Sequence, residues 1–581
     1  MTSRLWMPVL FLFSFGAAAC GSAASAPIRP GLSPCQEPGV PEGALCGTRE
    51  VFENRAARTG RKIPLRIVVL PATGRERFPD PFTYFAGGPG EASIPGGIFT
   101  AGELESLRRK RDVLLIDFRG TGESGGLFCT ELQEGPQGFL DDFLPLDKIR
   151  ACRDRLKNEV DLSWYTTDAA VDDVEEVRTA LGYGPLNLMG VSYGTRAVLT
   201  YLRRHPQSVR TATLSGVLDP EARYPLGLAR ASQQALDGLI AECEGDPACR
   251  GAYPKLRQEV DAVLGRVAAE PVRVRLADPR FGLVELLLTR SGVAQTLRYM
   301  LYSPAEAALV PLTIQRAAQG DWKPLARLAH LYGLEMDAMA QGFYQSVTCA
   351  EDVAFLRDEE IAPAVAGTFL GDFRVRRQKV ACEGWPIRDL GPDLHAPVVS
   401  GVPALLISGE RDPATPAENG ERAARTLKRA RHVIVPDGAH SLTGMQGADC
   451  VSSLIAAFIE TGTADGLDTS CIARMRRMAF ELPEVTVARA GLAGLQGSYV
   501  QEEMGLKIKV DLREDRLRLT VLQGPPFPPA LLIPTSPTRF RWEGEGLAPG
   551  LAVVFEVTEG NATALTIVQP GKPLVVMKRS E

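Results

Sequence analysis

The stretch that decides the fold is residues 186–204, which read Leu-Asn-Leu-Met-Gly-Val-Ser-Tyr-Gly-Thr-Arg-Ala-Val-Leu-Thr-Tyr-Leu-Arg-Arg. Its first four residues form a short apolar run, as expected for a parallel strand buried on both faces. The segment from Thr195 to Arg204 has helical periodicity. Between them, residues 190–194 match Gly-x-Ser-x-Gly. A strand, a sharp turn flanked by glycines and a helix are the context of a nucleophile elbow, in which Ser192 projects from the carboxyl edge of a sheet.

Similar apolar runs occur on both sides of this stretch. We predict strands at 63–70, 82–86, 113–117, 186–189, 211–214, 404–407 and 433–435. Helical patterns separate them, including residues 168–181, which end just before Gly182. Strands that alternate with helices indicate an α/β protein with a doubly wound, mostly parallel sheet.

Two regions depart from this alternation. Residues 220–398 show mostly helical periodicity, and a helical insertion of this size is most simply a lid over one edge of the sheet. Residues 491–581 contain segments that alternate with period two, which predicts a small antiparallel β domain. The α/β core is therefore expected in two parts, 46–219 and 399–485.

The N-terminus has the features of an export signal, predicted over residues 1–26. Arg4 precedes an apolar run from Leu5 to Phe15, which is too short for a stable membrane span. Two cleavage sites compete. Residues 17–20 (Ala-Ala-Ala-Cys) resemble a bacterial lipoprotein signal, in which Cys20 carries the lipid, whereas residues 24–26 (Ala-Ser-Ala) suit the ordinary signal peptidase. We expect a protein exported from a bacterial cell, either as a periplasmic or outer-membrane lipoprotein or as a secreted protein.

The cysteines support export. The chain has 11 Cys, and either cleavage removes Cys20 and leaves an even number. In an oxidising compartment this suggests up to five disulfides. Pairing between nearest neighbours is plausible: 35–46, 129–152, 243–249, 349–382 and 450–471. The spacings do not resemble paired metal knuckles, so we expect no metal site.

Composition excludes several classes of protein. With 581 residues, 45% of them hydrophobic and 23% charged, the chain is typical of a globular protein. The net charge of −5 gives no electrostatic argument for binding nucleic acid or an anionic membrane. No apolar run after the N-terminal one approaches the ~20 residues that span a bilayer. We therefore expect no nucleic-acid partner, and no membrane contact other than a lipid anchor at Cys20.

Ser192 needs partners before it can act as a nucleophile, because a serine hydroxyl is weak without a base. In this architecture the chain order is Ser, acid, His. Of the five His residues, His440 follows the last predicted core strand and so lies at the same sheet edge as Ser192. The acid should follow the preceding strand, where Asp412 is the first candidate and Glu410 and Asp437 are alternatives.

Two glycine-rich turns remain. Residues 87–90 (Gly-Gly-Pro-Gly) follow a predicted strand, and the backbone amides of Gly88 and Tyr193 are the expected donors of an oxyanion hole; a plain glycine turn is the alternative. Residues 120–125 (Gly-Thr-Gly-Glu-Ser-Gly) match the dinucleotide pattern, but no helix opens there. We expect no cofactor.

Together these motifs resemble those of α/β-hydrolase serine peptidases. The segments that carry the resemblance are 87–90, 117–124, 190–194, 412–416 and 438–440. They are similar to proline iminopeptidases and more so to secreted bacterial tripeptidyl aminopeptidases, whose TAP-like C-terminal region is suggested by Cys349, residues 382–386 and the Cys450 and Cys471 pair. Proline iminopeptidases usually carry His before the glycine turn, where this chain has Ala86. The region beyond residue 491 is not part of the family core.

The resemblance implies a serine exopeptidase without a cofactor, which acts on peptide substrates near a free N-terminus and releases tripeptides or short peptides. A lid over the catalytic edge leaves room for a chain end but not for the middle of a chain. Capture of the protonated amine then requires a carboxylate, for which Glu351 and Asp352 are candidates; solvated surface acids are the alternative. Two other functions stay open: a carboxylesterase with the same triad and lid, and a binding protein on an inactive hydrolase scaffold.

Overall fold

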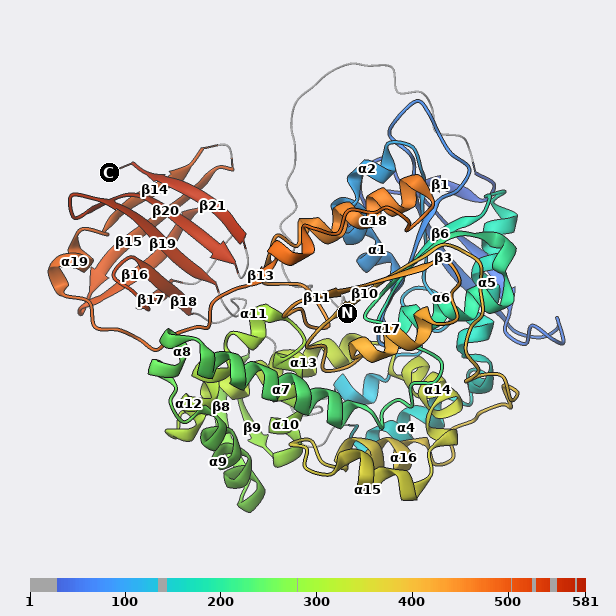
Figure 1. The fold of residues 1–581 in the computed structure, drawn as a ribbon, viewed down its shortest axis with the longest axis horizontal. Helices are drawn as coiled ribbons and strands as arrows, with labels where there is room; N and C mark the ends of the chain where they lie inside the picture. The colour runs from blue at the N-terminus through green and yellow to red at the C-terminus, as the bar shows by residue number, and fades with distance from the viewer. Residues whose placement is uncertain are drawn as a thin grey trace.

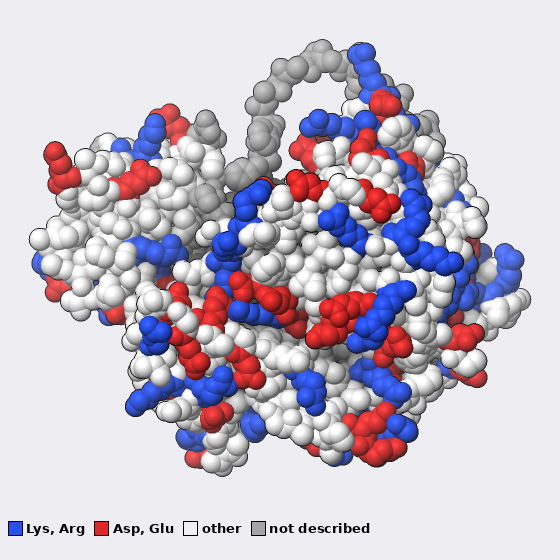
Figure 2. All heavy atoms as spheres, viewed as in Figure 1, with Lys and Arg blue, Asp and Glu red and all other residues white. Residues whose placement is uncertain are grey.

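The computed structural model describes residues 29–133, 144–278, 281–502, 504–524, 529–543, 551–569 and 572–580. The predicted signal peptide and Cys20 lie outside these ranges. Within them, no helix combines the length and the apolar character that crossing a membrane requires. Figure 2 shows acidic and basic side chains interspersed over one face of the molecule.

A nine-stranded sheet forms the centre of the protein (Figure 1), with strand order β1-β2-β3-β5-β4-β6-β7-β10-β11. The strands are β1 (Leu32–Pro34), β2 (Leu45–Phe52), β3 (Lys62–Leu70), β4 (Phe82–Phe85), β5 (Val113–Ile116), β6 (Leu186–Val191), β7 (Val209–Ser215), β10 (Ala404–Gly409) and β11 (Ala430–Val435). Pairing is antiparallel from β1 to β5 and parallel from β5 to β11. The predicted mostly parallel α/β sheet is confirmed, and the carboxyl ends of β4, β6, β10 and β11 share one edge.

Helices cover both faces of the sheet. Side chains of β5 alternate between two hydrophobic clusters: Leu114 and Ile116 pack with helices α5 (Thr167–Ala180) and α6 (Tyr193–Arg204). Val113 and Leu115 pack with α1 (Ser93–Glu103) and α18 (Asp449–Thr461). Burial on both faces is the reason that these strands are continuous apolar runs in the sequence. The described residues of this part form three further helices: α2 (Glu105–Arg108), α4 (Leu146–Leu156) and α17 (Ala417–Ala424).

The chain between β7 and β10 forms a lid (Figure 1). Its helices are α7 (Leu228–Gly245), α8 (Pro247–Ala252), α9 (Leu256–Ala269), α10 (Arg290–Met300), α11 (Pro304–Ala307), α12 (Val310–Ala318), α13 (Lys323–Ala338), α14 (Gln341–Glu351), α15 (Asp358–Val365) and α16 (Phe373–Cys382). The lid is not wholly helical, because β8 (Val272–Asp278) and β9 (Gly282–Leu288) form an antiparallel hairpin. Sequence analysis missed this hairpin, although Val274 and Leu276 alternate with exposed residues.

The C-terminal strands close into an eight-stranded antiparallel barrel, in which β14 pairs with β21. The strands are β14 (Gly497–Gln501), β15 (Leu506–Arg513), β16 (Arg516–Gln523), β17 (Ala530–Pro534), β18 (Arg539–Glu543), β19 (Ala552–Thr558), β20 (Asn561–Gln569) and β21 (Lys572–Arg579). Tyr499, Phe540 and Phe555 are fully or nearly fully buried in its interior, so side chains fill the barrel. The predicted antiparallel β domain is confirmed, and its closure is a new finding.

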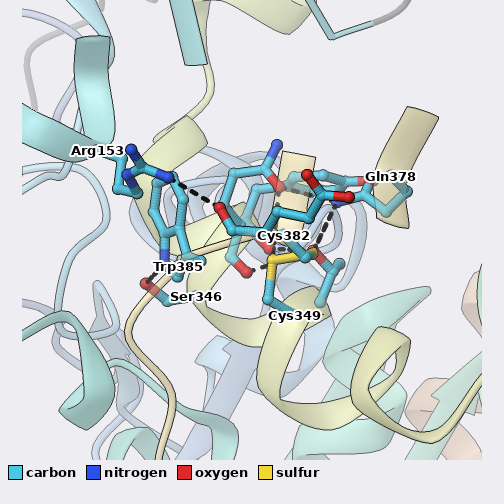
Figure 3. Close-up of a disulfide and its surroundings, with 10 residues drawn as sticks. Arg153, Ser346, Cys349, Gln378, Cys382 and Trp385 are labelled. Carbon is cyan, nitrogen blue, oxygen red and sulfur yellow. Dashed lines mark hydrogen bonds between the residues drawn. A yellow bond between two sulfur atoms is a disulfide. The ribbon is translucent and has the colours of Figure 1, made fainter. Parts of the chain in front are cut away.

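Five disulfides join nearest neighbours along the chain: 35–46, 129–152, 243–249, 349–382 and 450–471. Figure 3 shows the pair that links lid helices α14 and α16, Cys349 and Cys382. Beside it, Trp385 Nε1 donates to Ser346 Oγ at 3.0 Å, and Arg153 of α4 donates to the Glu383 carbonyl at 2.8 Å. These bonds hold one end of the lid together and attach it to the core.

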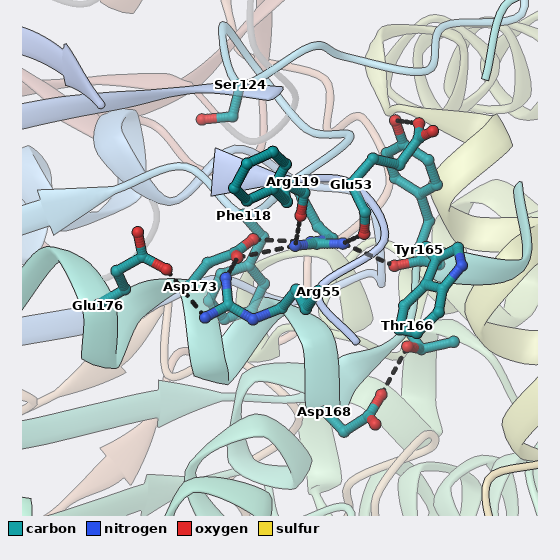
Figure 4. Close-up of polar contacts among 12 residues, drawn as sticks. Glu53, Arg55, Phe118, Arg119, Ser124, Tyr165, Thr166, Asp168, Asp173 and Glu176 are labelled. Atoms are coloured by element: carbon teal, nitrogen blue, oxygen red, sulfur yellow. Dashed lines mark hydrogen bonds and ion pairs between the residues drawn. The ribbon is translucent and has the colours of Figure 1, made fainter. Parts of the chain in front are cut away.

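The second glycine-rich turn, residues 120–125, comes directly after Arg119, which belongs to a network of ion pairs (Figure 4). The side chain of Arg119 is fully buried and donates to both carboxylate oxygens of Asp173 on α5, at 2.7 and 2.8 Å. Arg55 also pairs with Asp173, and Arg119 donates to the Glu53 carbonyl at 2.8 Å. Ser124 Oγ donates to the Asp117 carbonyl at 2.8 Å. These contacts give the turn a structural role that connects β2, β5 and α5.

Candidate active site

Ser192 lies in the sharp turn between β6 and α6. Its φ of 56° is unusual for a residue other than glycine and is the kind of backbone strain found at functional sites. The flanking glycines are required by space: a Cβ atom on Gly190 would lie 2.3 Å from the Gly194 carbonyl oxygen, and one on Gly194 would lie 2.1 Å from that of Phe85. Thr195 Oγ1 donates to the Ser192 carbonyl at 2.6 Å and fixes the turn.

His440 and Asp412 meet at the same sheet edge, after β11 and β10. His440 Nδ1 lies 2.8 and 3.0 Å from the two carboxylate oxygens of Asp412. Asp412 also accepts from Thr415 Oγ1 at 2.7 Å and from the backbone amides of Thr415 and Ala414 at 2.8 Å. Burial alone would raise the pKa of Asp412, but His440 and the two amides together hold it below its ordinary value. Asp412 is therefore ionised and orients the imidazole.

The two alternative acids are engaged elsewhere. Glu410 Oε2 accepts from the Asp437 backbone amide at 3.0 Å, and the Asp437 carboxylate pairs with Arg411 at 2.6 Å. The structure thus brings Asp412 against His440 and places Glu410 and Asp437 in a separate contact.

A pocket opens at Ser192. Its wall contains Gly88, Pro89, Ser192, Tyr193, Arg196, Leu218, Tyr224, Tyr302, Asp352, Ala414 and Thr415. Both predicted oxyanion donors, Gly88 and Tyr193, are therefore in the same wall as Ser192. Thr415 connects this wall to the His–Asp pair, because its Oγ1 lies 3.1 Å from His440 Nδ1.

The two predicted lid carboxylates have different surroundings. Glu351 is 1% exposed and accepts from the Thr167 amide at 2.6 Å and from Thr167 Oγ1 at 2.7 Å. Burial raises its pKa to about 7, and it does not line the pocket. Asp352 does line the pocket, where it pairs with Arg196 of α6 at 2.9 Å.

Sequence analysis missed a third carboxylate, Glu91, which directly follows the Gly-Gly-Pro-Gly turn. A Cβ atom placed on Gly87 would lie 3.3 Å from both Ser192 Cβ and Glu91 Oε2, so the two side chains flank the same glycine. Glu91 is an exposed residue. Displacement of bulk water by the surrounding protein nevertheless raises the pKa of its carboxyl group, and the Gly87 amide and His440 oppose this rise. Glu335 of α13 interacts electrostatically with Glu91. Loss of water and the charges of Glu306 and Glu91 together raise the pKa of Glu335 to about 7.

Glu91 has no cationic partner in the part of the chain that the structure describes, since no Lys or Arg pairs with it there. Its position at the carboxyl end of β4, next to the glycine turn, was the signal that could have identified it from sequence.

Among the residues that the structure describes, two groups of side chains have the spacing of metal ligands, but both contain cysteines that are joined in disulfides and cannot act as thiolates: Cys35, Glu37 and Cys46, and Cys129, Glu131 and Cys152.

Comparison with known proteins agrees with this geometry. A family model described as alpha/beta hydrolase fold matches residues 81–253, and one described as TAP-like protein matches residues 368–471. Serine protease Hip1 of Mycobacterium tuberculosis is 25% identical over 470 residues, which cover 74% of this chain and 88% of Hip1. The protein is a serine hydrolase of the α/β-hydrolase fold.

Other relatives of this serine hydrolase carry two different activities in their names. A tripeptidyl aminopeptidase of Streptomyces lividans is 24% identical over 474 residues, covering 74% of this chain and 84% of the relative. Carboxylesterase B of Mycobacterium tuberculosis is 25% identical over 464 residues, covering 74% of this chain and 86% of the relative. The similarity to each relative thus extends over most of this chain and most of the relative. The relatives named as a serine protease and an aminopeptidase support a serine peptidase.

Proposed function

We propose that this serine hydrolase is an aminopeptidase that hydrolyses peptide bonds near a free N-terminus and releases tripeptides or short peptides. The observation that carries the proposal is the position of Ser192. Thr415, which donates to Asp412 of the Asp412–His440 pair, lines the same pocket under the lid, and the Glu91 carboxylate beside Ser192 has no Lys or Arg partner among the described residues. A nucleophile, a base and an acceptor for an ammonium group are the parts that this reaction needs.

In the proposed mechanism, Ser192 Oγ attacks the scissile carbonyl while His440 takes its proton. The amides of Gly88 and Tyr193 stabilise the oxyanion that forms on the carbonyl oxygen. His440 then gives the proton to the leaving amine, and an acyl-enzyme remains. Water activated by His440 hydrolyses this ester, and Asp412 stabilises the imidazolium in both steps.

The lid and the loop after β4 supply the acids for the substrate amine. Of the two predicted lid carboxylates, only Asp352 lines the pocket, and Arg196 already balances its charge. Glu91 is a better acceptor, because an ammonium group gains most from a carboxylate that no cation neutralises. We assign the amine primarily to Glu91, with Glu335 adding negative potential, and regard Glu351 as a structural acid bound to Thr167.

The proposal is tested with a free-amine tripeptide anilide, its N-acetylated twin and a short-chain ester. We expect the purified protein to cleave the free tripeptide, and acetylation to lower kcat/KM about 30-fold or more, because a lost partner in a desolvated charge pair costs about 2 kcal/mol or more. Ser192→Ala should abolish turnover of every substrate. Glu91→Gln should reduce the effect of acetylation, whereas Glu359→Gln, an exposed lid glutamate, should not.

A carboxylesterase is the second candidate, supported by the similarity to carboxylesterase B. Both functions use the same triad and lid, and they differ in the leaving group and in the need for an α-amine. Turnover of the ester alone, with no anilide cleaved, would replace the aminopeptidase by the esterase. If an S192A protein still hydrolysed either substrate, the nucleophile itself would be wrong.

We also propose that the protein is exported. The five disulfides support this, because disulfides persist in oxidising compartments. For the anchor, we propose a lipid on Cys20. Metabolic labelling with a palmitate analogue should label the wild type and not Cys20→Ala; an unlabelled, fully released wild type would instead indicate cleavage after Ala26.

A further inference from the structure

Behind the pocket wall, lid helix α10 carries a buried arginine. Arg298 is 1% exposed, and its Nη2 atom donates to the Tyr302 hydroxyl. The guanidinium carbon lies 5.1 Å from the ring centroid of Tyr299 and 4.8 Å from that of Tyr302. Its Nε and Nη1 atoms have no hydrogen-bond partner, and no Asp or Glu among the described residues pairs with it.

This arrangement is energetically unusual. Arginine keeps its charge under all ordinary conditions, and a buried cation loses much of its hydration free energy unless an anion compensates. Cation–π contacts with the two tyrosines offset only part of that loss. The positive charge of Arg298 is therefore incompletely balanced by the described part of the chain.

Two tyrosine hydroxyl groups connect the buried arginines to the pocket. Tyr302 and Tyr224 both line the pocket with Ser192. Tyr302 Oη accepts from Arg298, and no described residue accepts from its O–H group, which is left to donate into the pocket. Tyr224 Oη accepts from Arg374 of α16, a second buried arginine, at 2.9 Å. A hydroxyl that accepts from a guanidinium is polarised and becomes a stronger donor.

Two carboxylates belong to the surroundings of this wall: Asp412, which is bound to His440 and interacts electrostatically with Tyr302, and Asp352. Asp352 is held by Arg196 at 2.9 Å. Glu351 directs both oxygens to Thr167 and lies outside the pocket wall. Glu91, which interacts electrostatically with His440, and Glu335 of α13 are not among the residues that line the pocket. The hydroxyls of Tyr224 and Tyr302 are thus the groups of this wall that receive hydrogen bonds from buried guanidinium groups, those of Arg374 and Arg298.

We propose that this wall is an anion subsite that takes a substrate carboxylate, with Tyr302 and Tyr224 as hydrogen-bond donors and Arg298 as the balancing charge. The inference rests on the proposed function for its choice of peptide substrates. The carboxylate comes from one of two sources: the side chain of an acidic residue next to the scissile bond, or the C-terminus of a short peptide. The site then binds a charged substrate at two places, the ammonium group at Glu91 and the carboxylate at Tyr302.

Two pairs of substrates distinguish the two sources. The first pair is a tripeptide anilide with Glu at the scissile bond and its Gln twin. The second is a free tetrapeptide and its C-terminal amide. In the wild type, kcat/KM should favour the acidic member of at least one pair by tenfold or more. The ratio should fall below twofold in Arg298→Met and in Tyr302→Phe.

Tyr299→Phe is the matched control. Tyr299 also stacks on Arg298, but its hydroxyl donates to Met336 Sδ at 3.4 Å, so the variant should keep the wild-type ratio. If Arg298→Met fails to fold, Tyr302→Phe, which removes one oxygen atom, still tests the subsite.

A binding measurement separates failure of the subsite from failure of the proposed function. N-acetylglutamate should raise the thermal midpoint of the wild type more than N-acetylglutamine does, and this difference should vanish in Tyr302→Phe. Such a difference in a protein that cleaves only esters would retain the subsite and reject the aminopeptidase. Equal midpoint shifts, with both substrate ratios below twofold, would overturn the subsite.

Discussion

Tyr302 of the lid lies edge-on to His440 of the core, with ring centroids 4.9 Å apart. The Tyr302 carbonyl also accepts from the amide of Ser441, the residue after His440, at 2.8 Å. On the other side of the site, the amide of Ala340 donates to the Gly90 carbonyl at 3.0 Å. The lid is thus bonded to the loop that carries His440 and to the Gly-Gly-Pro-Gly turn, so the position of the lid and the geometry of the proposed catalytic site are coupled.

Thr415 should affect the base through Asp412. In Thr415→Val the carboxylate loses the hydroxyl donor at 2.7 Å, and a hydrogen bond to a charged group contributes about 1.5–3 kcal/mol. We expect kcat/KM to fall about tenfold or more and the acidic limb of its pH profile to move to higher pH, because the pKa of Asp412 rises when a donor is removed. Thr415→Ser should restore both; a valine variant with the wild-type profile would contradict this role.

The Arg119–Asp173 pair should be important for stability. Asp173→Asn leaves a fully buried guanidinium with a neutral partner, and breaking a buried pair costs about 3–5 kcal/mol. The control is Asp237→Asn, which breaks the exposed pair with Arg257 and should cost less than about 1 kcal/mol. Denaturant unfolding measures both. Equal losses in the two variants would show that burial does not determine the cost.

The elbow should not tolerate a side chain at Gly194. In Gly194→Ala the new Cβ would lie 2.1 Å from the Phe85 carbonyl oxygen, and backbone rather than a flexible side chain would have to move. We expect loss of soluble protein or of more than 99% of activity. Gly102→Ala, near the end of α1 with open space around it, should retain activity and gain up to about 1 kcal/mol. A soluble, active Gly194→Ala enzyme would contradict the geometry of the turn.

Glu351 should make stability depend on pH. Its pKa is about 7 in the folded protein against an ordinary value of 4.5, so the folded state binds more protons between these values. The free energy of unfolding should therefore fall as pH rises from about 4.5 to 7, by up to about 3 kcal/mol relative to Glu351→Gln, and the difference should be constant above this range. Thermal unfolding across pH 4–8 measures it. A stability difference between the two proteins that stays flat across this range would show that Glu351 titrates normally.

The sequence predicted the core well where local pattern and tertiary environment agree. Leu186 to Met189 is apolar because both faces of β6 are covered, so the pattern itself reports the fold. The positions of His440 and Asp412 followed from chain order and strand direction, and the structure brings both together. The nearest-neighbour cysteine pairs also match the five disulfides.

What the sequence did not reveal depends on distant contacts. The partners of Glu351 and Asp352, Thr167 and Arg196, are more than 150 residues away along the chain. The excess charge at Arg298 is visible only once the surrounding tyrosines are placed. Closure of the barrel depends on β14 meeting β21, a pairing between its first and last strands that no local alternation specifies.

The lid leaves the core at β7 and returns at β10, and these strands are hydrogen-bonded neighbours. Because the two strands are parallel, the carboxyl end of β7 and the amino end of β10 lie at opposite ends of the pair, and the connection has to cross the sheet. The lid is thus an insertion within a crossover connection: a replacement, such as a lid grafted from another hydrolase, keeps the register of the sheet only if it also returns the chain to the amino end of β10. Substrate range can thus diverge in this architecture while the residues of the proposed triad keep their places.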